Sequence, residues 1–158
     1  MVTMSVDDLL TRYAAGERAF RRVDLSGADL EGATLADADL SGARLFGARF
    51  AGADLWGATL DRADLAIADL RAADLRGASL RHATLCHADL ASALLFGASL
   101  RQADLRHADL RDVRLFGVDL TDARLDGARL GDSRSDAAQR ESATRSRAAL
   151  STLRHTIV

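Results

Sequence analysis

The sequence predicts an all-β solenoid with a short helical cap at its N-terminal end. Two observations carry this prediction. Leu stands at every fifth position from Leu25 to Leu130, with Phe50 as the one substitute, which gives 22 repeat centres in an unbroken register. Aromatic residues make up only 4% of the 158-residue chain, so a layered core built on large rings is disfavoured.

A period of five excludes the two simplest backbones. Five residues advance an α-helix by about 500°, so successive centres would spread around a helix. A continuous strand would turn every second centre to its opposite face. The centres share one interior only if the chain turns a corner within each repeat.

The other repeat positions fit such a coil. Ala stands two residues before 19 of the 22 centres, and Val23, Val113 and Val118 take the remaining places, so this position is also expected to point inward. Asp directly precedes 11 centres, where its carboxylate can bond to nearby backbone. Gly follows 10 centres by two positions, where a corner requires a positive φ. The expected core includes Leu30, Phe50, Leu70, Leu90 and Leu110.

These residues form a known signature. Units such as Ala28-Asp29-Leu30-Glu31-Gly32 match the motif A(D/N)LXX, and the sequence resembles the pentapeptide-repeat family from about Phe20 to Asp132, roughly 70% of the chain. The resemblance implies a right-handed quadrilateral β-helix with four repeats per coil. Five and a half such coils, spaced by about 4.8 Å, would make a rod of about 26 Å.

The chain divides into three segments. Residues 1–19 are expected to form a helical cap, because Ser5 and two Asp residues precede the apolar Leu9, Leu10 and Tyr13, and Gly16 ends the pattern. Residues 20–132 form the solenoid. Residues 133–158 leave the register and form a C-terminal tail or short helix. This segment either covers the last coil or, as in some relatives, pairs two copies into a homodimer.

No residue pattern points to an enzyme. A phosphate-binding P-loop needs Lys, which the chain lacks. His87 and His107 would stack on one face beside Cys86 and Arg106, but a zinc site needs three or four converging ligands, so a polar ladder is the favoured interpretation. The carboxylates recur on a convex rod without an evident pocket. We expect no catalytic residues, no cofactor and no metal.

An exposed aromatic stripe is predicted on one face. Trp56, Arg76, Phe96 and Phe116 are 20 residues apart and would align, with Leu94 beside Phe96 and Phe46 on the adjoining face. One interpretation is local stacking, in which Arg76 covers a ring. The other is a contact surface for a protein partner or a second copy.

A candidate acidic partner surface lies on another face. It comprises Asp29, Glu31, Asp69, Asp89 and Asp109, and four Arg residues interrupt it. The best-known relatives by role are bacterial fluoroquinolone-resistance proteins, which mimic DNA and bind DNA gyrase or topoisomerase IV.

The charge of the solenoid bears on such mimicry. Residues 24–132 carry 18 acids and 12 Arg, whereas a duplex of about 26 Å carries about 15 negative charges. Residues 24–70 hold 9 of those acids and only 3 Arg, so a DNA-like potential is confined to this half.

The sequence therefore predicts a non-catalytic, protein-binding solenoid. DNA gyrase or topoisomerase IV is the leading specific partner, and a scaffold that binds another protein through the aromatic stripe is the alternative. Direct nucleic-acid binding is not expected, because acids interleave with the Arg residues. The single cysteine excludes an internal disulfide framework, and no apolar run or signal-peptide pattern is present, so a cytoplasmic protein without membrane contact is expected.

Overall fold

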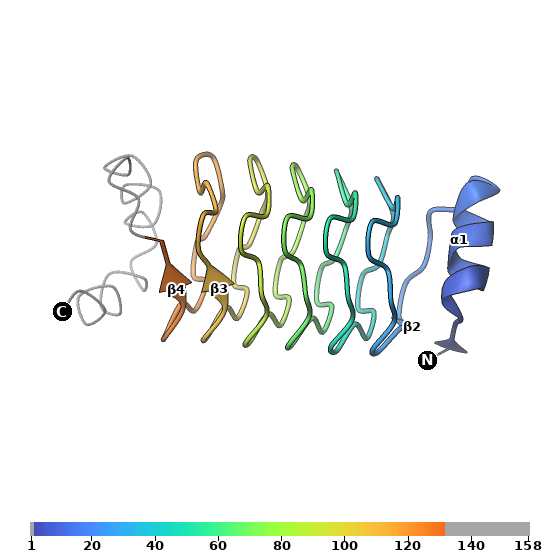
Figure 1. Ribbon diagram of the computed structural model, residues 1–158, viewed down its shortest axis with the longest axis horizontal. Coiled ribbons are helices and arrows are strands. Elements are labelled where there is room, and N and C mark those ends of the chain that lie inside the picture. The colour runs from blue at the N-terminus through green and yellow to red at the C-terminus, as the bar shows by residue number, and fades with distance from the viewer. Residues whose placement is uncertain (1, 132–158) are drawn as a thin grey trace.

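The protein is a rod of stacked coils with one helix at its N-terminal end (Figure 1). The computed structural model describes residues 2–131. The tail or short helix expected at residues 133–158 lies outside these residues.

Each coil contains 20 residues. Parallel bridges join residues 20 positions apart all along the rod, from Ala19 with Asp39 to Asp104 with Arg124. Twenty residues hold four five-residue repeats, so each coil has four sides, and the predicted solenoid is confirmed. Most sides are too short to count as strands.

The regular strands are only two residues long. β1 (Val2–Thr3) pairs in parallel with β2 (Val23–Asp24), and β3 (Asp109–Leu110) pairs in parallel with β4 (Arg129–Leu130). Strand β1 precedes the five-residue repeats. It adds one more parallel strand beside the first coil by pairing with β2.

Every backbone N–H of a typical repeat has a partner. In residues 70–74 three N–H groups donate to carbonyls of neighbouring coils: those of the centre, of the corner and of the last residue. One of the other two closes the turn within the repeat, and one donates to a carboxylate. The five bonds are Leu70 N to Asp89 O (2.7 Å), Arg71 N to Asp69 Oδ1 (3.1 Å), Ala72 N to Ala91 O (3.0 Å), Ala73 N to Leu70 O (3.1 Å) and Asp74 N to Ala53 O (2.9 Å). The coil can therefore turn four corners without leaving a buried donor unpaired.

The corner position, two residues after each centre, has a left-handed backbone throughout. Its φ is positive at all 22 positions from Arg22 to Gly127, of which 10 are Gly and 12 are not. The predicted link between Gly and the corner holds, but the corner does not need Gly. Ile67, with a φ of 52°, is the most costly occupant, because β-branched side chains rarely adopt this conformation.

The interior is a stack of Leu, Ala and Phe. The repeat centres from Leu25 to Leu125 are buried, and Leu130, in the last described coil, is partly exposed. The Ala or Val two residues before each centre is buried from Ala38 to Ala128. Leu30, Phe50, Leu70, Leu90 and Leu110 are all at most 2% exposed.

Helix α1 (Val6–Ala14) closes the first coil. The Ser5 side chain accepts a hydrogen bond from the Asp8 N–H at 3.1 Å, and Asp7 and Asp8 lie in the first turn, where the helix dipole favours negative charge. Leu9 is fully buried, and the Tyr13 hydroxyl donates to the Ala36 carbonyl at 2.9 Å. The helix therefore covers apolar surface that the first coil would otherwise expose.

Substitutions at two corners test the cost of the left-handed backbone. Gly52→Ala adds a Cβ at a φ of 65° with nothing within 4 Å, so it should lower the free energy of unfolding by about 1 kcal/mol through the backbone alone. Ile67→Asn should raise the free energy of unfolding by about 1 kcal/mol, because Asn tolerates the left-handed conformation and Ile67 is half exposed. Urea unfolding followed by circular dichroism measures both. Unchanged midpoints in both variants would show that the corners are not strained.

Candidate functional site

The surface of the rod is organised as ladders. Because bridges join residues 20 apart, side chains with that spacing lie one above the other along the axis. Two ladders contain the residues singled out in the sequence.

The acidic partner surface lies on one ladder and its edge. Asp29, Arg49, Asp69, Asp89, Asp109 and Arg129 follow one another through successive bridges. Glu31 joins them, because Arg49 contacts both Asp29 (2.8 Å) and Glu31 (2.6 Å).

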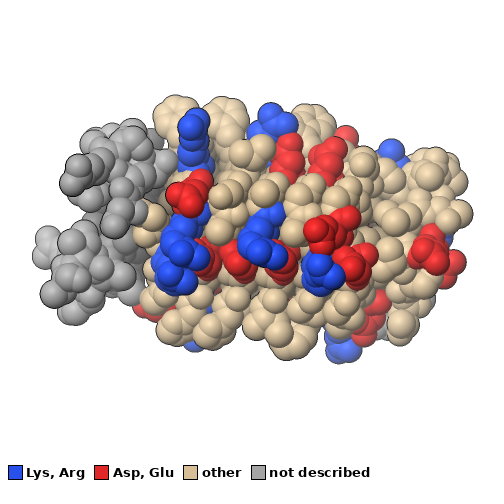
Figure 2. All heavy atoms as spheres, viewed as in Figure 1, with Lys and Arg blue, Asp and Glu red and all other residues tan. Residues whose placement is uncertain are grey.

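Arginines neutralise the rest of this surface. Arg71 lies 2.6 Å from Asp69 and 3.8 Å from Asp89. Arg111 and Arg129 lie 2.7 Å and 3.3 Å from Asp109. In Figure 2 acidic and basic side chains alternate along the visible face of the rod. The acidic surface is thus a chain of ion pairs and does not present a continuous negative potential.

The Asp residues before the centres serve the backbone. All 11 accept a hydrogen bond from the N–H two residues later through Oδ1. Four of them, Asp69, Asp74, Asp104 and Asp109, also bond to an Arg side chain in the same repeat. The Arg106 side chain, which donates to both oxygens of Asp104, lowers the pKa of Asp104 to about 2. Arg71 and Arg111 likewise hold the pKa values of Asp69 and Asp109 below their usual range.

Acid should destabilise the rod through these carboxylates. Their pKa values are lower in the folded chain than in the unfolded one, so the unfolded state takes up protons first. Their stabilising contribution is complete above the unfolded pKa of about 4 and is lost as the pH falls toward about 2. Thermal unfolding between pH 7 and pH 2 measures this, and Asp104→Asn should flatten part of the decline. A melting temperature that stays constant from pH 5 to pH 2 would contradict it.

The aromatic stripe (Trp56, Arg76, Phe96, Phe116) lies on a different face. The rings of Phe96 and Phe116 stack with centroids 6.1 Å apart and an interplanar angle of 13°. Their exposed fractions are 59% and 63%, and Trp56 is 50% exposed. Arg76 is bound to Asp74 of its own repeat at 2.5 Å, and among residues 2–131 the cation–π contacts are those of Arg12 with Phe20 and Arg18 with Tyr13.

The stripe is widest near the C-terminal end of the rod. Leu94, half exposed, flanks Phe96, and the Phe96 ring lies over Gly117, where an added Cβ would come within 3.4 Å of it. Between residues 19 and 129 the bridge ladder is interrupted at one step, Leu94 to Arg114. Two stacked rings and a Leu therefore form an apolar patch where the backbone ladder is weakest.

A second apolar position was missed in the sequence. Ile67 is 51% exposed and lies over Gly47, next to Phe46, which is 48% exposed. Phe46 is ten residues, half of a 20-residue coil, from Trp56, so the prediction that it lies on the face adjoining the stripe is wrong: it lies on the opposite side of the rod. The exposure of Ile67 could have been predicted from its position two residues after a repeat centre, because that position forms a corner and points outward.

The described residues offer little for metal or nucleophilic chemistry. His87 and His107 stack at 4.9 Å, and Cys86 Sγ lies 3.8 Å from Arg106 Nη2. Partial burial raises the pKa of the Cys86 thiol. From residue 2 to residue 131, no three His, Cys, Asp or Glu side chains converge as a metal site would require. In the same range, no helix has the length and apolar character needed to cross a membrane.

Comparisons with known proteins agree with the geometry. A family model for pentapeptide repeats matches in 8 copies, over residues 19–50, 43–70, 68–94 and 93–132. No curated protein matches the sequence significantly. Among solved structures, a pentapeptide repeat protein from the Arabidopsis thaliana thylakoid lumen is 25% identical, with 84% of this chain and 79% of that chain covered and a TM-score of 0.54.

Two further structures are similar over much of the rod. A pentapeptide repeat protein from Nostoc PCC 7120 is 31% identical, with 82% of this chain and 97% of that chain covered and a TM-score of 0.44. QnrB1, a plasmid-mediated fluoroquinolone resistance protein, is 22% identical, with 73% and 64% covered and a TM-score of 0.46. The family match and the four-sided coil together establish the predicted right-handed quadrilateral β-helix.

Proposed function

The chain belongs to the pentapeptide-repeat family, and from that premise we propose that it is a non-catalytic rod that binds a protein partner. Proteins of this family are generally structural or interaction proteins. The support in this chain is its exposed apolar surface: large side chains about half exposed at Phe46, Trp56, Ile67, Leu94, Phe96 and Phe116. Aromatic side chains on a rigid surface are typical of protein contacts.

The specific partner that we propose is a bacterial type II topoisomerase, DNA gyrase or topoisomerase IV, bound as a DNA mimic in the cytoplasm. The rod shape and the acidic excess of residues 24–70 support this proposal. Within residues 2–131, four carboxylates of that half form no ion pair with an Arg side chain. One of them, Asp61, accepts from the Ser79 hydroxyl and the Arg81 N–H, and the other three are Asp37, Asp54 and Asp64. The proposal assigns the DNA-like potential to these groups, because the acidic partner surface is largely neutralised.

A gyrase supercoiling assay tests the topoisomerase proposal. The purified chain should inhibit supercoiling near enzyme stoichiometry, lose inhibition with added salt, and reduce fluoroquinolone-induced cleavage. The triple substitution Asp37→Asn, Asp54→Asn and Asp64→Asn should weaken inhibition. A matched control, Asp112→Asn, Asp122→Asn and Asp126→Asn, removes the same charge from residues 71–132, which hold 9 acids and 9 Arg, and should retain inhibition. No inhibition by the parent chain at large excess would exclude the topoisomerase.

The alternative partner is another protein, bound through the aromatic stripe in a scaffold. The stacked pair Phe96 and Phe116, both more than half exposed, favours this second candidate. Rigid exposed rings bury much apolar area on binding at little cost in side-chain entropy.

Site-specific photo-crosslinking tests the aromatic stripe. A photoreactive phenylalanine at position 116 should yield a discrete protein adduct in cells, and Phe96→Ser should diminish it. The same probe at Gln102, which is exposed on another face, serves as the control. Equal adducts from both positions would discard the stripe as a binding surface, and an adduct with a second copy of the chain would identify a homodimer.

A further inference from the structure

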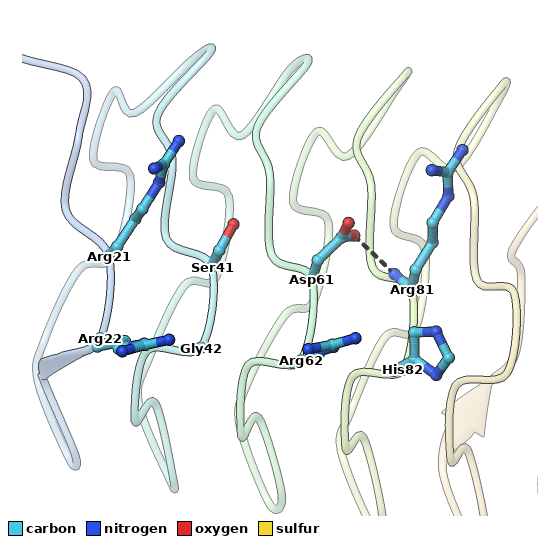
Figure 3. A pocket seen from close by; sticks show the side chains of 8 residues that line it. All are labelled: Arg21, Arg22, Ser41, Gly42, Asp61, Arg62, Arg81 and His82. Atoms are coloured by element: carbon cyan, nitrogen blue, oxygen red, sulfur yellow. Dashed lines mark hydrogen bonds between the residues drawn. The ribbon is translucent and has the colours of Figure 1, made fainter.

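A basic hollow lies on a face that neither partner proposal uses. It has a volume of about 640 Å³, and its charged lining consists of Arg21, Arg22, Arg62, Arg81, His82 and Asp61 (Figure 3). Four of these six side chains are Arg cations, against one carboxylate. The charge of this hollow is therefore opposite to that of the net acidic solenoid around it.

Two adjacent ladders build the hollow. Arg21, Ser41, Asp61 and Arg81 form the first ladder, and Arg22, Gly42, Arg62 and His82 form the second. The small Ser41 and Gly42 leave the space between larger neighbours. The Arg22 side chain extends along the rod over Gly42, where an added Cβ would lie 3.4 Å from Arg22 Cγ, and the Arg62 side chain extends toward His82 (Figure 3).

The guanidinium groups here lack the carboxylate partners found elsewhere. Ten Arg residues between positions 2 and 131 form ion pairs, and six do not. Four of those six lie on these two ladders: Arg22, Arg62, Arg81 and Arg101. Arg21 pairs with Asp39, so it contributes less net charge to the hollow.

The single acid in the hollow is turned toward the backbone. Asp61 Oδ1 accepts from the Ser79 hydroxyl (2.5 Å) and from the Arg81 N–H (3.0 Å). The Arg81 side chain has only a long contact, Nε to the Ser99 hydroxyl at 3.4 Å. Arg22, Arg62 and Arg81 all line the hollow without an ion pair, but only the Arg22 and Arg62 side chains extend along the rod in the same direction, whereas the Arg81 side chain extends away from them (Figure 3).

We propose that the basic hollow binds an oligophosphate, a linear chain of two or more phosphate groups, either free or as the phosphate chain of a nucleotide. Guanidinium groups bind phosphate oxygens through paired hydrogen bonds, and several of them around one hollow match a ligand of high charge density. The volume of the hollow, about 640 Å³, is typical of small-ligand sites.

The spacing of the cations selects an elongated ligand. Arg22, Arg62 and Arg81 come from the first, third and fourth coils, and three coil steps of about 4.8 Å span about 14 Å of the axis. One phosphate cannot reach both Arg22 and Arg62, which are two coils apart on one ladder, whereas a chain of phosphates lying along the axis can contact them in turn. A long polyanion would meet the acidic remainder of the solenoid and be repelled.

Isothermal titration with sodium tripolyphosphate, in magnesium-free buffer at low salt, tests the proposal. Tripolyphosphate should bind with saturation at one site per chain, and inorganic phosphate at least about tenfold more weakly, because it reaches fewer guanidinium groups. ATP distinguishes the two sources of the ligand. Equal affinities indicate recognition of the phosphate chain alone, and tighter binding of ATP indicates a nucleotide.

Matched variants locate the site. Arg62→Gln should weaken tripolyphosphate binding about tenfold, and Arg22→Gln should act in the same way. Arg114→Gln removes an equally unpaired charge from another face and should leave the affinity unchanged. Asp61→Asn should tighten binding, because it removes the one negative charge from the lining. Absence of saturable binding, or equal losses in Arg62→Gln and Arg114→Gln, would overturn the proposal.

Discussion

The structure depends on one constraint: a chain that turns a corner every five residues must still pair its backbone N–H groups. In residues 70–74 three donors bond to neighbouring coils, one closes the turn, and one bonds to the carboxylate of Asp69. This arrangement requires a left-handed corner and favours a short acceptor side chain before each centre. The interior is then narrow, which explains why Leu and Ala fill it almost alone.

The same constraint shapes the surface on which function rests. An Asp that accepts a backbone hydrogen bond can also form an ion pair with an Arg of its own or a neighbouring coil. Much of the negative charge is therefore neutralised within the rod. The groups left for partners are those outside this pairing: the stacked rings of Phe96 and Phe116, a few acids such as Asp54, and the unpaired arginines of the basic hollow. The basic hollow lies on a different side of the coil from the other two sets, whereas Asp54 lies on the ladder that leads through Asp74 to Leu94, beside the stacked rings.

Much of the fold was predictable from the sequence, because a register without slips determines which residues are buried and which are stacked. Leu70, at a repeat centre, and the capping Ser5 are examples. The pairing of Arg49 with both Asp29 and Glu31 was not predictable, since it depends on side-chain rotamers. The basic hollow was missed although Arg22, Arg62 and His82 lie at multiples of 20 residues, because its space comes from small neighbours in the intervening coil.

Native-state hydrogen exchange measured residue by residue tests the hydrogen-bonding account most directly. Corner amides are near the surface, yet Gly52 donates to Arg71 O at 2.8 Å and Ala72 to Ala91 O at 3.0 Å in the next coil. We expect these amides to exchange slowly and together with those of the buried centres. The Trp56 amide, which bonds to the Asp54 carboxylate at 3.1 Å, should exchange faster. Corner amides that exchange as rapidly as Trp56 would contradict the account.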